Sequence, residues 1–216
     1  MTQHSKDVAM RWDTLADRYD EIVKTAKSFS PDWIARHAHD IDDLPECRVL
    51  DLACGTGLNV KALSERRSGI RADGVDISSK MIEHARATGK YESFCKHNLN
   101  HPLLELPATT YDLVIAFHFL QFLSDAFVCI SECHRLLKVN GILWASFKRY
   151  EAEDPASPPR QISTGDSTVT GYSAGEILHM MSNLNMRVIA VESLVGHLSQ
   201  NGFGIPYLVV EARKTQ

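Results

Sequence analysis

Short apolar runs alternate along the chain with segments whose apolar residues recur at helical spacing. From Cys47 onward the runs are CRVLDLA, IRADGVDI, YESFCKH, YDLVIAF and GILWASF, separated by stretches such as LNVKALSERR and SSKMIEHARATG. This alternation is typical of βαβ units and a parallel sheet. The run YDLVIAF is apolar on both alternating faces, which predicts a central strand covered by helices on both sides. The pattern therefore predicts an α/β fold.

The segments that flank these runs extend the prediction to the whole chain. Residues 6–26 and 31–39 have helical spacing of apolar residues, and the end of the chain reads as one helix followed by two strands. The segment rich in Glu, Asp, Pro, Ser, Thr and Gly after the fifth strand is expected to be a mobile loop and a candidate lid. We expect one domain, 1–216, with a helical cap (1–44), a core (45–148), the mobile loop (149–172) and a C-terminal helix and strand pair (173–216).

The composition of the chain limits its expected core size, partners and location. A chain of 216 residues with 44% hydrophobic residues can bury one substantial core. The formal net charge of -4 gives no general attraction to nucleic acid or anionic membranes, so neither is expected as a partner. Five cysteines, no apolar leader and no membrane-spanning run predict a cytoplasmic protein with reduced thiols.

The most informative segment is VLDLACGTG, a strand that turns through Gly55 and Gly57 directly into a helix. Gly55 lets a ligand approach the backbone, and the free amides of the helix favour an anionic group. Nineteen residues after Gly57, Asp76 ends the next strand, where its carboxylate can accept both hydroxyls of a ribose. A dinucleotide fingerprint needs a third small residue where this chain has Val60, which disfavours a nicotinamide cofactor.

The ordered set VLDLACGTG, GVDIS, YDLVIAF and RLLKVNGILWAS, within residues 48–147, resembles the class I S-adenosylmethionine-dependent methyltransferases. The resemblance implies a Rossmann-like, mostly parallel seven-stranded sheet with helices on both faces and an antiparallel C-terminal strand. It also implies a methyltransferase (EC 2.1.1) of the small-molecule type that uses S-adenosyl-L-methionine. Asn98 stands where the family usually carries Asp, and its amide oxygen can still accept a hydrogen bond from adenine.

The resemblance also implies roles for individual residues. Asp51, Gly55 and Gly57 would hold the methionine end of the cofactor, Asp76 the ribose, Ile77 and Met81 the adenine face, and Asn98 and Leu99 the adenine edge. Ala53 and Phe117 would complete the cofactor site, and Tyr19, in a segment similar to the N-terminal cap of small-molecule members, would reach the cofactor carboxylate. His118, Phe119 and Phe122 would contact the acceptor.

Several alternatives remain open. His118 is a candidate general base, and it could equally be a hydrogen-bonded wall residue. His97 with His101, and Cys129 and Cys133 with His134, form no complete ligand set, so no metal is expected. The favoured acceptor atom is O, N or S of a small molecule; protein or RNA acceptors, a nicotinamide-dependent oxidoreductase, and a cofactor-binding partner without activity are the other hypotheses. The chain could be a monomer or a homodimer.

Overall fold

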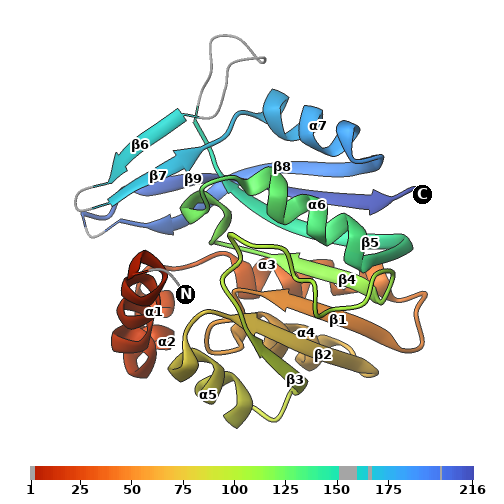
Figure 1. Cartoon of the computed structure of the whole chain (residues 1–216), viewed down its shortest axis with the longest axis horizontal. Coiled ribbons are helices and arrows are strands. Elements are labelled where there is room, and N and C mark those ends of the chain that lie inside the picture. The colour runs from red at the N-terminus through yellow and green to blue at the C-terminus, as the bar shows by residue number, and fades with distance from the viewer. Residues whose placement is uncertain (1–2, 151–159, 165–166, 200) are drawn as a thin grey trace.

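The computed structural model describes residues 3–150, 160–164, 167–199 and 201–216, and its main feature is a seven-stranded sheet (Figure 1). The strands are ordered β3-β2-β1-β4-β5-β9-β8. Their bounds are β1 Cys47–Leu52, β2 Ile70–Asp76, β3 Tyr91–Lys96, β4 Tyr111–Ala116, β5 Leu137–Lys148, β8 Met186–Leu198 and β9 Gly204–Lys214. Strands β1 to β5 pair in parallel, whereas β9 is antiparallel to both β5 and β8. The predicted Rossmann-like sheet is confirmed.

Helices cover both faces of this sheet. They are α1 Gln3–Leu15, α2 Tyr19–Thr25, α3 Ser30–His37, α4 Leu58–Arg66, α5 Ser79–Ala87, α6 Ala126–Leu136 and α7 Ala174–Asn183. One apolar cluster joins α3 and α4 to the sheet through residues such as Trp33, Leu63 and Trp144. The other cluster joins α6 and α7 to the opposite face, with Ile130 and Met181 fully buried. None of the helices in the described ranges is both long and apolar enough to cross a membrane.

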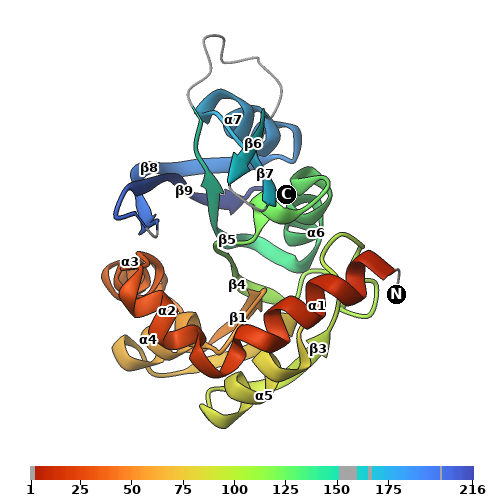
Figure 2. The same cartoon turned by 90° about the vertical axis from the view of Figure 1, so that its left-hand side faces the viewer.

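Several hydrogen bonds hold the N-terminal helices to the rest of the fold, and two groups of them position the helices beside the site. Asp13 of α1 accepts hydrogen bonds from the Ser78 hydroxyl and the Lys80 amide, at the N-terminus of α5. Ser78 is itself the N-cap of α5 and accepts from the Met81 amide at 3.1 Å. Figure 2 shows α1 lying alongside α5 as a result.

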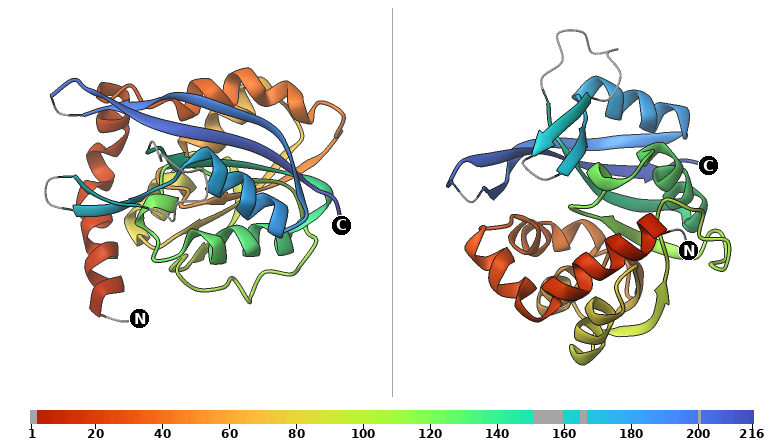
Figure 3. Two further views of the ribbon diagram at one scale, coloured as in Figure 1. Left: turned by 90° about the horizontal axis from the view of Figure 1, so that it is seen from above. Right: turned by 60° about the vertical axis from the view of Figure 1, so that its left-hand side comes forward.

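The second attachment joins the cap to the C-terminal strand pair. The Phe29 amide donates to the Gly196 carbonyl at 3.0 Å, and the Leu198 amide donates to the Ala26 carbonyl at 2.7 Å. Figure 3 shows the ends of β8 and β9 reaching the N-terminal helices. Segments from the two ends of the chain therefore meet beside the carboxyl ends of the central strands.

The segment predicted as one mobile loop, 149–172, differs in part from that prediction. Residues Arg160–Thr164 (β6) and Ser167–Gly171 (β7) form an antiparallel hairpin, and Val169 and Tyr172 are buried. The overall composition of the segment concealed two short runs, RQIST and STVTG, whose β-branched residues favour strands. Residues 151–159 lie outside the described part of the chain.

Candidate functional site

Two adjoining cavities lie at the carboxyl ends of β1, β2 and β4. The first, of about 370 Å³, is lined by Asp76 and by Ile77, Met81, Asn98 and Leu99; we call it the Asp76 cavity. The second, of about 300 Å³, is lined by Gln121 and by Ser28, His118, His197 and Tyr207; we call it the Gln121 chamber. A crevice at the carboxyl ends of strands is the usual ligand site of open α/β sheets.

Seven residues line both cavities and therefore mark the junction between them: Trp12, Tyr19, Ala53, Gly55, Phe117, His118 and Phe122. Four of these, Tyr19, Ala53, Gly55 and Phe117, are among the residues predicted to contact cofactor, and two, His118 and Phe122, among those predicted to contact the acceptor. Phe119, which was also predicted to contact the acceptor, lines only the Asp76 cavity. The structure thus brings most of the predicted site residues into one continuous crevice.

The turn after β1 has a backbone that few side chains adopt. Ala53, Gly55 and Gly57 have φ values of 51°, 54° and 92°. Gly57 N-caps α4, and a Cβ atom there would lie 3.3 Å from the Cα atom of Ala85 in α5. The turn is therefore fixed both by its own conformation and by the neighbouring helix.

Replacing Gly57 with alanine should lower the free energy of unfolding by about 1–3 kcal/mol, because the left-handed conformation and the contact with Ala85 both become unfavourable. Gly89→Ala is the matched control, since Gly89 also has positive φ, of 66°, but has open space where the Cβ would stand. Urea denaturation of both variants measures the difference. If the two variants lose the same free energy of unfolding, the close packing of the turn on α5 contributes nothing to stability.

Asp76 joins the ends of β1 and β2. Its Oδ2 accepts from the Gly55 amide and its Oδ1 from the Ser78 amide, both at 2.9 Å. Burial raises the pKa of Asp76, and these backbone donors oppose that rise. A carboxylate oxygen can accept more than one hydrogen bond, so each oxygen of Asp76 keeps capacity for a ligand hydroxyl in the cavity.

Asp51 and Gly57 lie behind the crevice wall, because neither lines either cavity. Asp51 is fully buried and accepts hydrogen bonds from the Tyr91 hydroxyl at 2.7 Å and the Asn59 amide at 3.3 Å. Burial raises the pKa of Asp51 to about 7 despite these donors. Their predicted contact with the methionine end of a cofactor stays a prediction, while the structure gives both residues a bracing role.

Asp51→Asn provides a pH test of this buried carboxyl group. The pKa of Asp51 is about 7 in the folded state and 3.8 unfolded, so the folded state binds the extra proton and loses stability as pH rises through this window. Between about pH 4 and pH 8 the wild type should therefore lose about 2–4 kcal/mol relative to the asparagine variant, which does not titrate. The measurement is urea denaturation of both proteins across that range. A difference between them that does not change with pH would contradict the raised pKa.

The remaining predicted residues line the Asp76 cavity. Ile77, Met81 and Leu99 supply apolar surface, and Asn98 lies beside them. The Asn98 amide nitrogen donates to the Ser5 hydroxyl at 2.8 Å, and its oxygen accepts from Asn100. Both polar ends of Asn98 thus already have protein partners, one of them on α1.

Tyr19 follows the first cap helix and lines both cavities, as its predicted approach to a ligand requires. Burial and then the nearby Asp76 raise the pKa of Tyr19 to about 12. Its phenol is therefore a neutral hydrogen-bond donor at physiological pH. Its ring lies 3.5 Å from the position that a Cβ on Gly55 would occupy, which places Tyr19 directly over the turn.

His118 stands at the end of β4 in a strained backbone conformation, with φ of 65°. Two hydrogen bonds hold it there: its amide donates to the Ser146 hydroxyl at 2.8 Å, and its carbonyl accepts from the Gln121 side-chain amide at 2.7 Å. The ring Nε2 lies 3.0 Å from the Ser28 hydroxyl. Strain maintained by several contacts is common where a side chain must be positioned for function.

The surroundings of His118 keep its ring neutral. Burial, and secondly the nearby His197, lower the pKa of His118 to about 3. The neutral ring can accept a proton or a hydrogen bond, which is the form that a base requires. The same burial disfavours the imidazolium, so a proton taken here would be passed on or balanced by a bound anion.

The residues of the crevice that the sequence did not predict include Trp12, Ser28, Gln121, His197 and Tyr207. Ser28 comes from the cap, Gln121 from the turn after β4, and the last two from β8 and β9. Only the folded chain brings these distant segments together, and none of them carries a local motif.

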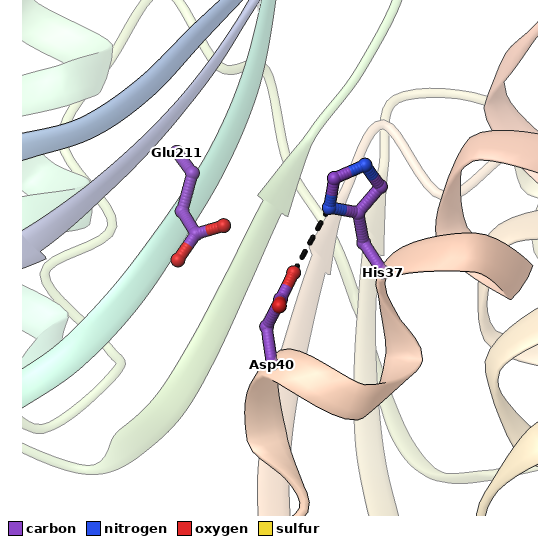
Figure 4. A group of neighbouring side chains, drawn as sticks. All are labelled: His37, Asp40 and Glu211. Carbon is purple, nitrogen blue, oxygen red and sulfur yellow. Dashed lines mark hydrogen bonds and ion pairs between the residues drawn. The ribbon is translucent and has the colours of Figure 1, made fainter.

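A group of possible metal ligands lies elsewhere, between the cap and the C-terminal strands (Figure 4). One ligand atom each from His37, Asp40 and Glu211 lies within 4.8 Å of the others. His37 Nδ1 is 2.9 Å from Asp40 Oδ2, and His37 Nε2 is 3.1 Å from Glu192 Oε1. These pairings connect α3 to β8, and none of the residues lines either cavity.

Comparisons with known proteins find similarity to methyltransferases. The family model described as "Methyltransferase domain" matches residues 50–145. Demethylmenaquinone methyltransferase of Thermotoga maritima is 35% identical over 145 residues, which cover 64% of this chain and 61% of that protein. Malonyl-[acyl-carrier protein] O-methyltransferase of Acetivibrio thermocellus is 28% identical over 142 residues, covering 64% and 48%. The chain thus spans less than two thirds of the length of either relative.

A solved structure extends the likeness to the whole fold. The 1,6-didemethyltoxoflavin-N1-methyltransferase of Burkholderia thailandensis, crystallised with 1,6-didemethyltoxoflavin and S-adenosylhomocysteine, superposes with a TM-score of 0.71 at 16% identity. The alignment covers 100% of this chain and 92% of that one. At this identity the likeness shows a shared fold.

Proposed function

We propose, because residues 50–145 match the family described as "Methyltransferase domain", that the chain is an S-adenosylmethionine-dependent methyltransferase (EC 2.1.1). The observation that carries the proposal is the buried Asp76 carboxylate, held by the Gly55 and Ser78 amides at the wall of a cavity of about 370 Å³. A carboxylate at this position suits the two hydroxyls of a ribose.

The residues around Asp76 fit the rest of an adenosyl nucleoside. Ile77, Met81 and Leu99 offer apolar surface for a purine ring, and the Asn100 and Asn98 side chains lie at the same wall. Gly55 at the junction leaves room for a ligand to pass the backbone, and the neutral Tyr19 phenol above it can donate to a carboxylate. Asp51 would support this turn from behind through Tyr91 and Asn59.

When bound, S-adenosylmethionine supplies an electrophilic methyl group: the bond from the acceptor atom to methyl forms, the sulfur to methyl bond breaks with its electron pair left on sulfur, and the acceptor loses its proton. This chain would align the two reactants and exclude water from the junction. The neutral ring of His118 lies at that junction and can accept a hydrogen bond or the proton of the acceptor. Ser28 orients the ring through Nε2.

A small molecule is the acceptor that the crevice suits best. The Gln121 chamber encloses about 300 Å³, which is the scale of pockets for small ligands. Relatives named for demethylmenaquinone and 1,6-didemethyltoxoflavin support this choice. A protein or RNA acceptor is the second candidate, because Phe122, at the junction, is 46% exposed and so open to a larger partner.

The test combines binding and turnover. Isothermal titration with S-adenosylhomocysteine measures whether the crevice takes the nucleoside, and the chain is expected to bind it. A small-molecule extract is then incubated with the chain and methyl-labelled cofactor, and labelled products are identified by mass spectrometry. Absence of binding would refute the proposal, whereas binding without transfer to any acceptor would favour a cofactor-binding partner protein. If a whole-cell extract is used in place of the small-molecule extract, label found only in its protein or RNA would assign the second candidate.

A further inference from the structure

The Gln121 chamber is the place where a methyl acceptor must lie, if the proposed function holds. The nucleoside would occupy the Asp76 cavity, and the junction residues shared by both cavities mark where the two reactants meet. The chamber begins at this junction and extends toward Ser28, His197 and Tyr207. Its chemistry therefore decides which acceptors can enter.

The wall of the chamber has no formal charge. The described residues that line it include no aspartate, glutamate, lysine or arginine. Burial lowers the pKa of both histidines in the wall, His118 and His197, so that both rings are neutral near pH 7. Lys148 lies close enough to lower the pKa of His197 further, but Lys148 does not line the chamber. An anionic acceptor would lose its hydration here without gaining a paired cation from this wall.

Gln121 supplies a hydrogen-bond acceptor that the protein itself does not use. Its side chain is 4% exposed, and its amide nitrogen donates to the His118 carbonyl and to the Tyr207 hydroxyl at 3.0 Å. These two bonds fix the orientation of the amide. Its Oε1 is buried and has no hydrogen-bond partner among the described residues. Such an atom is costly to leave unpaired, and a donor on a bound molecule would satisfy it.

Aromatic side chains shape the entrance to the chamber. Trp12 and Phe122 contact each other edge to face, with ring centroids 6.1 Å apart, and Phe117 completes the junction. Phe29 lies behind them, 4.6 Å from the His118 ring. Rings around a pocket favour flat guests, since a planar molecule can contact several of them at once.

From these three observations we infer that the acceptor is a planar, uncharged molecule whose O–H or N–H nucleophile faces His118 and which carries a second hydrogen-bond donor for Gln121. Gln121 is then a specificity-determining residue, and carboxylates and phosphates are poor acceptors. The inference rests on the proposed function, because it takes the neighbouring cavity to be filled by the nucleoside.

The first experiment measures binding of matched probes to the chain saturated with S-adenosylhomocysteine. Naphthalen-1-ol is neutral near neutral pH, whereas naphthalene-1-carboxylate has the same ring system and a negative charge. Isothermal titration is expected to give a dissociation constant at least about tenfold lower for the naphthol. Equal or tighter binding of the carboxylate would overturn the inference. If Lys148→Met then abolished carboxylate binding, the chamber would be assigned as an anion site that uses Lys148.

The second experiment tests Gln121 itself. Naphthalene-1,3-diol adds one donor to naphthalen-1-ol and should bind about tenfold more tightly to the wild type. Gln121→Met keeps the length of the side chain and removes its amide, so the advantage of the diol should disappear. An advantage that persists in the variant would overturn the role of Gln121. If this variant does not fold, the comparison of naphthol with carboxylate on the wild type still decides the question of charge.

The two proposals fail in different ways. Failure of S-adenosylhomocysteine to bind would refute the proposed function before any acceptor is added. Normal binding of S-adenosylhomocysteine, together with a preference for the charged probe, would leave the methyltransferase proposal standing and refute the acceptor class alone.

Discussion

Replacing Asp76 with alanine is expected to weaken binding of S-adenosylhomocysteine by about 100-fold or more. Hydrogen bonds to a charged group contribute about 1.5–3 kcal/mol each, and a ribose offers two hydroxyls, so the loss approaches about 3 kcal/mol or more. The variant also leaves the Gly55 and Ser78 amides without their acceptor, which loosens the turn that the ligand must pass. Isothermal titration measures the change.

Asp73→Ala is the matched control for this prediction. Asp73 is a second buried carboxylate of β2, but it pairs with Arg48, Ser93 and Tyr111 and lines neither cavity. Its loss should lower the free energy of unfolding while leaving affinity for S-adenosylhomocysteine within about threefold. If the two variants bind equally well, Asp76 has no direct contact with the nucleoside.

Replacing His118 with asparagine is expected to lower kcat by about 100-fold or more with an acceptor that must lose a proton, because a positioned base contributes about 10²–10⁴-fold. The affinity of the variant for S-adenosylhomocysteine, measured separately, shows whether the substitution also disturbs the wall that the two cavities share. The lowered pKa of His118, about 3, adds a second expectation: kcat of the wild type should show no fall centred near pH 6.5, where an ordinary histidine becomes protonated.

His84→Asn serves as the control, since His84 lies on α5, pairs with Asp17 and lines neither cavity. This control variant should retain the kcat of the wild type. A His118→Asn variant within about fivefold of wild type would identify His118 as a wall residue and would leave deprotonation to water or to the acceptor's own acidity.

The parts of the site that could be predicted from sequence are those made by contiguous residues. The turn through Gly55 and Gly57 and the acid at the end of β2 each depend on a few neighbouring positions, whose conformations are restricted by sterics. Parallel pairing of β1 with β2 then brings Asp76 to Gly55, because the carboxyl ends of parallel strands meet at one edge. The parallel sheet follows from the same alternation of strands and helices, whereas its seven strands and antiparallel C-terminal strand were implied by the family resemblance.

The chamber could not be predicted in this way. Ser28, His118 and Tyr207 come from three segments separated by about ninety residues each, and only tertiary packing brings them together. The β6–β7 hairpin was missed because polar residues dominate the composition around it, although Tyr172, just after β7, packs on Phe147 in the core. Asp51 is a candidate both for contact with the ligand and for bracing the turn from behind, and its complete burial supports the bracing role without testing the contact.

The bonds between residues 26–29 and the end of β8 have a consequence for biosynthesis. Because Gly196 and Leu198 hold the backbone beside Ser28, the Gln121 chamber combines residues of the N-terminal helical segment with residues of β8 and β9. A ribosome-bound chain that has emerged only as far as β5 already contains the strands and turns around Asp76. It still lacks His197 and Tyr207, so the wall of the Gln121 chamber is completed only once β8 and β9 have been synthesised.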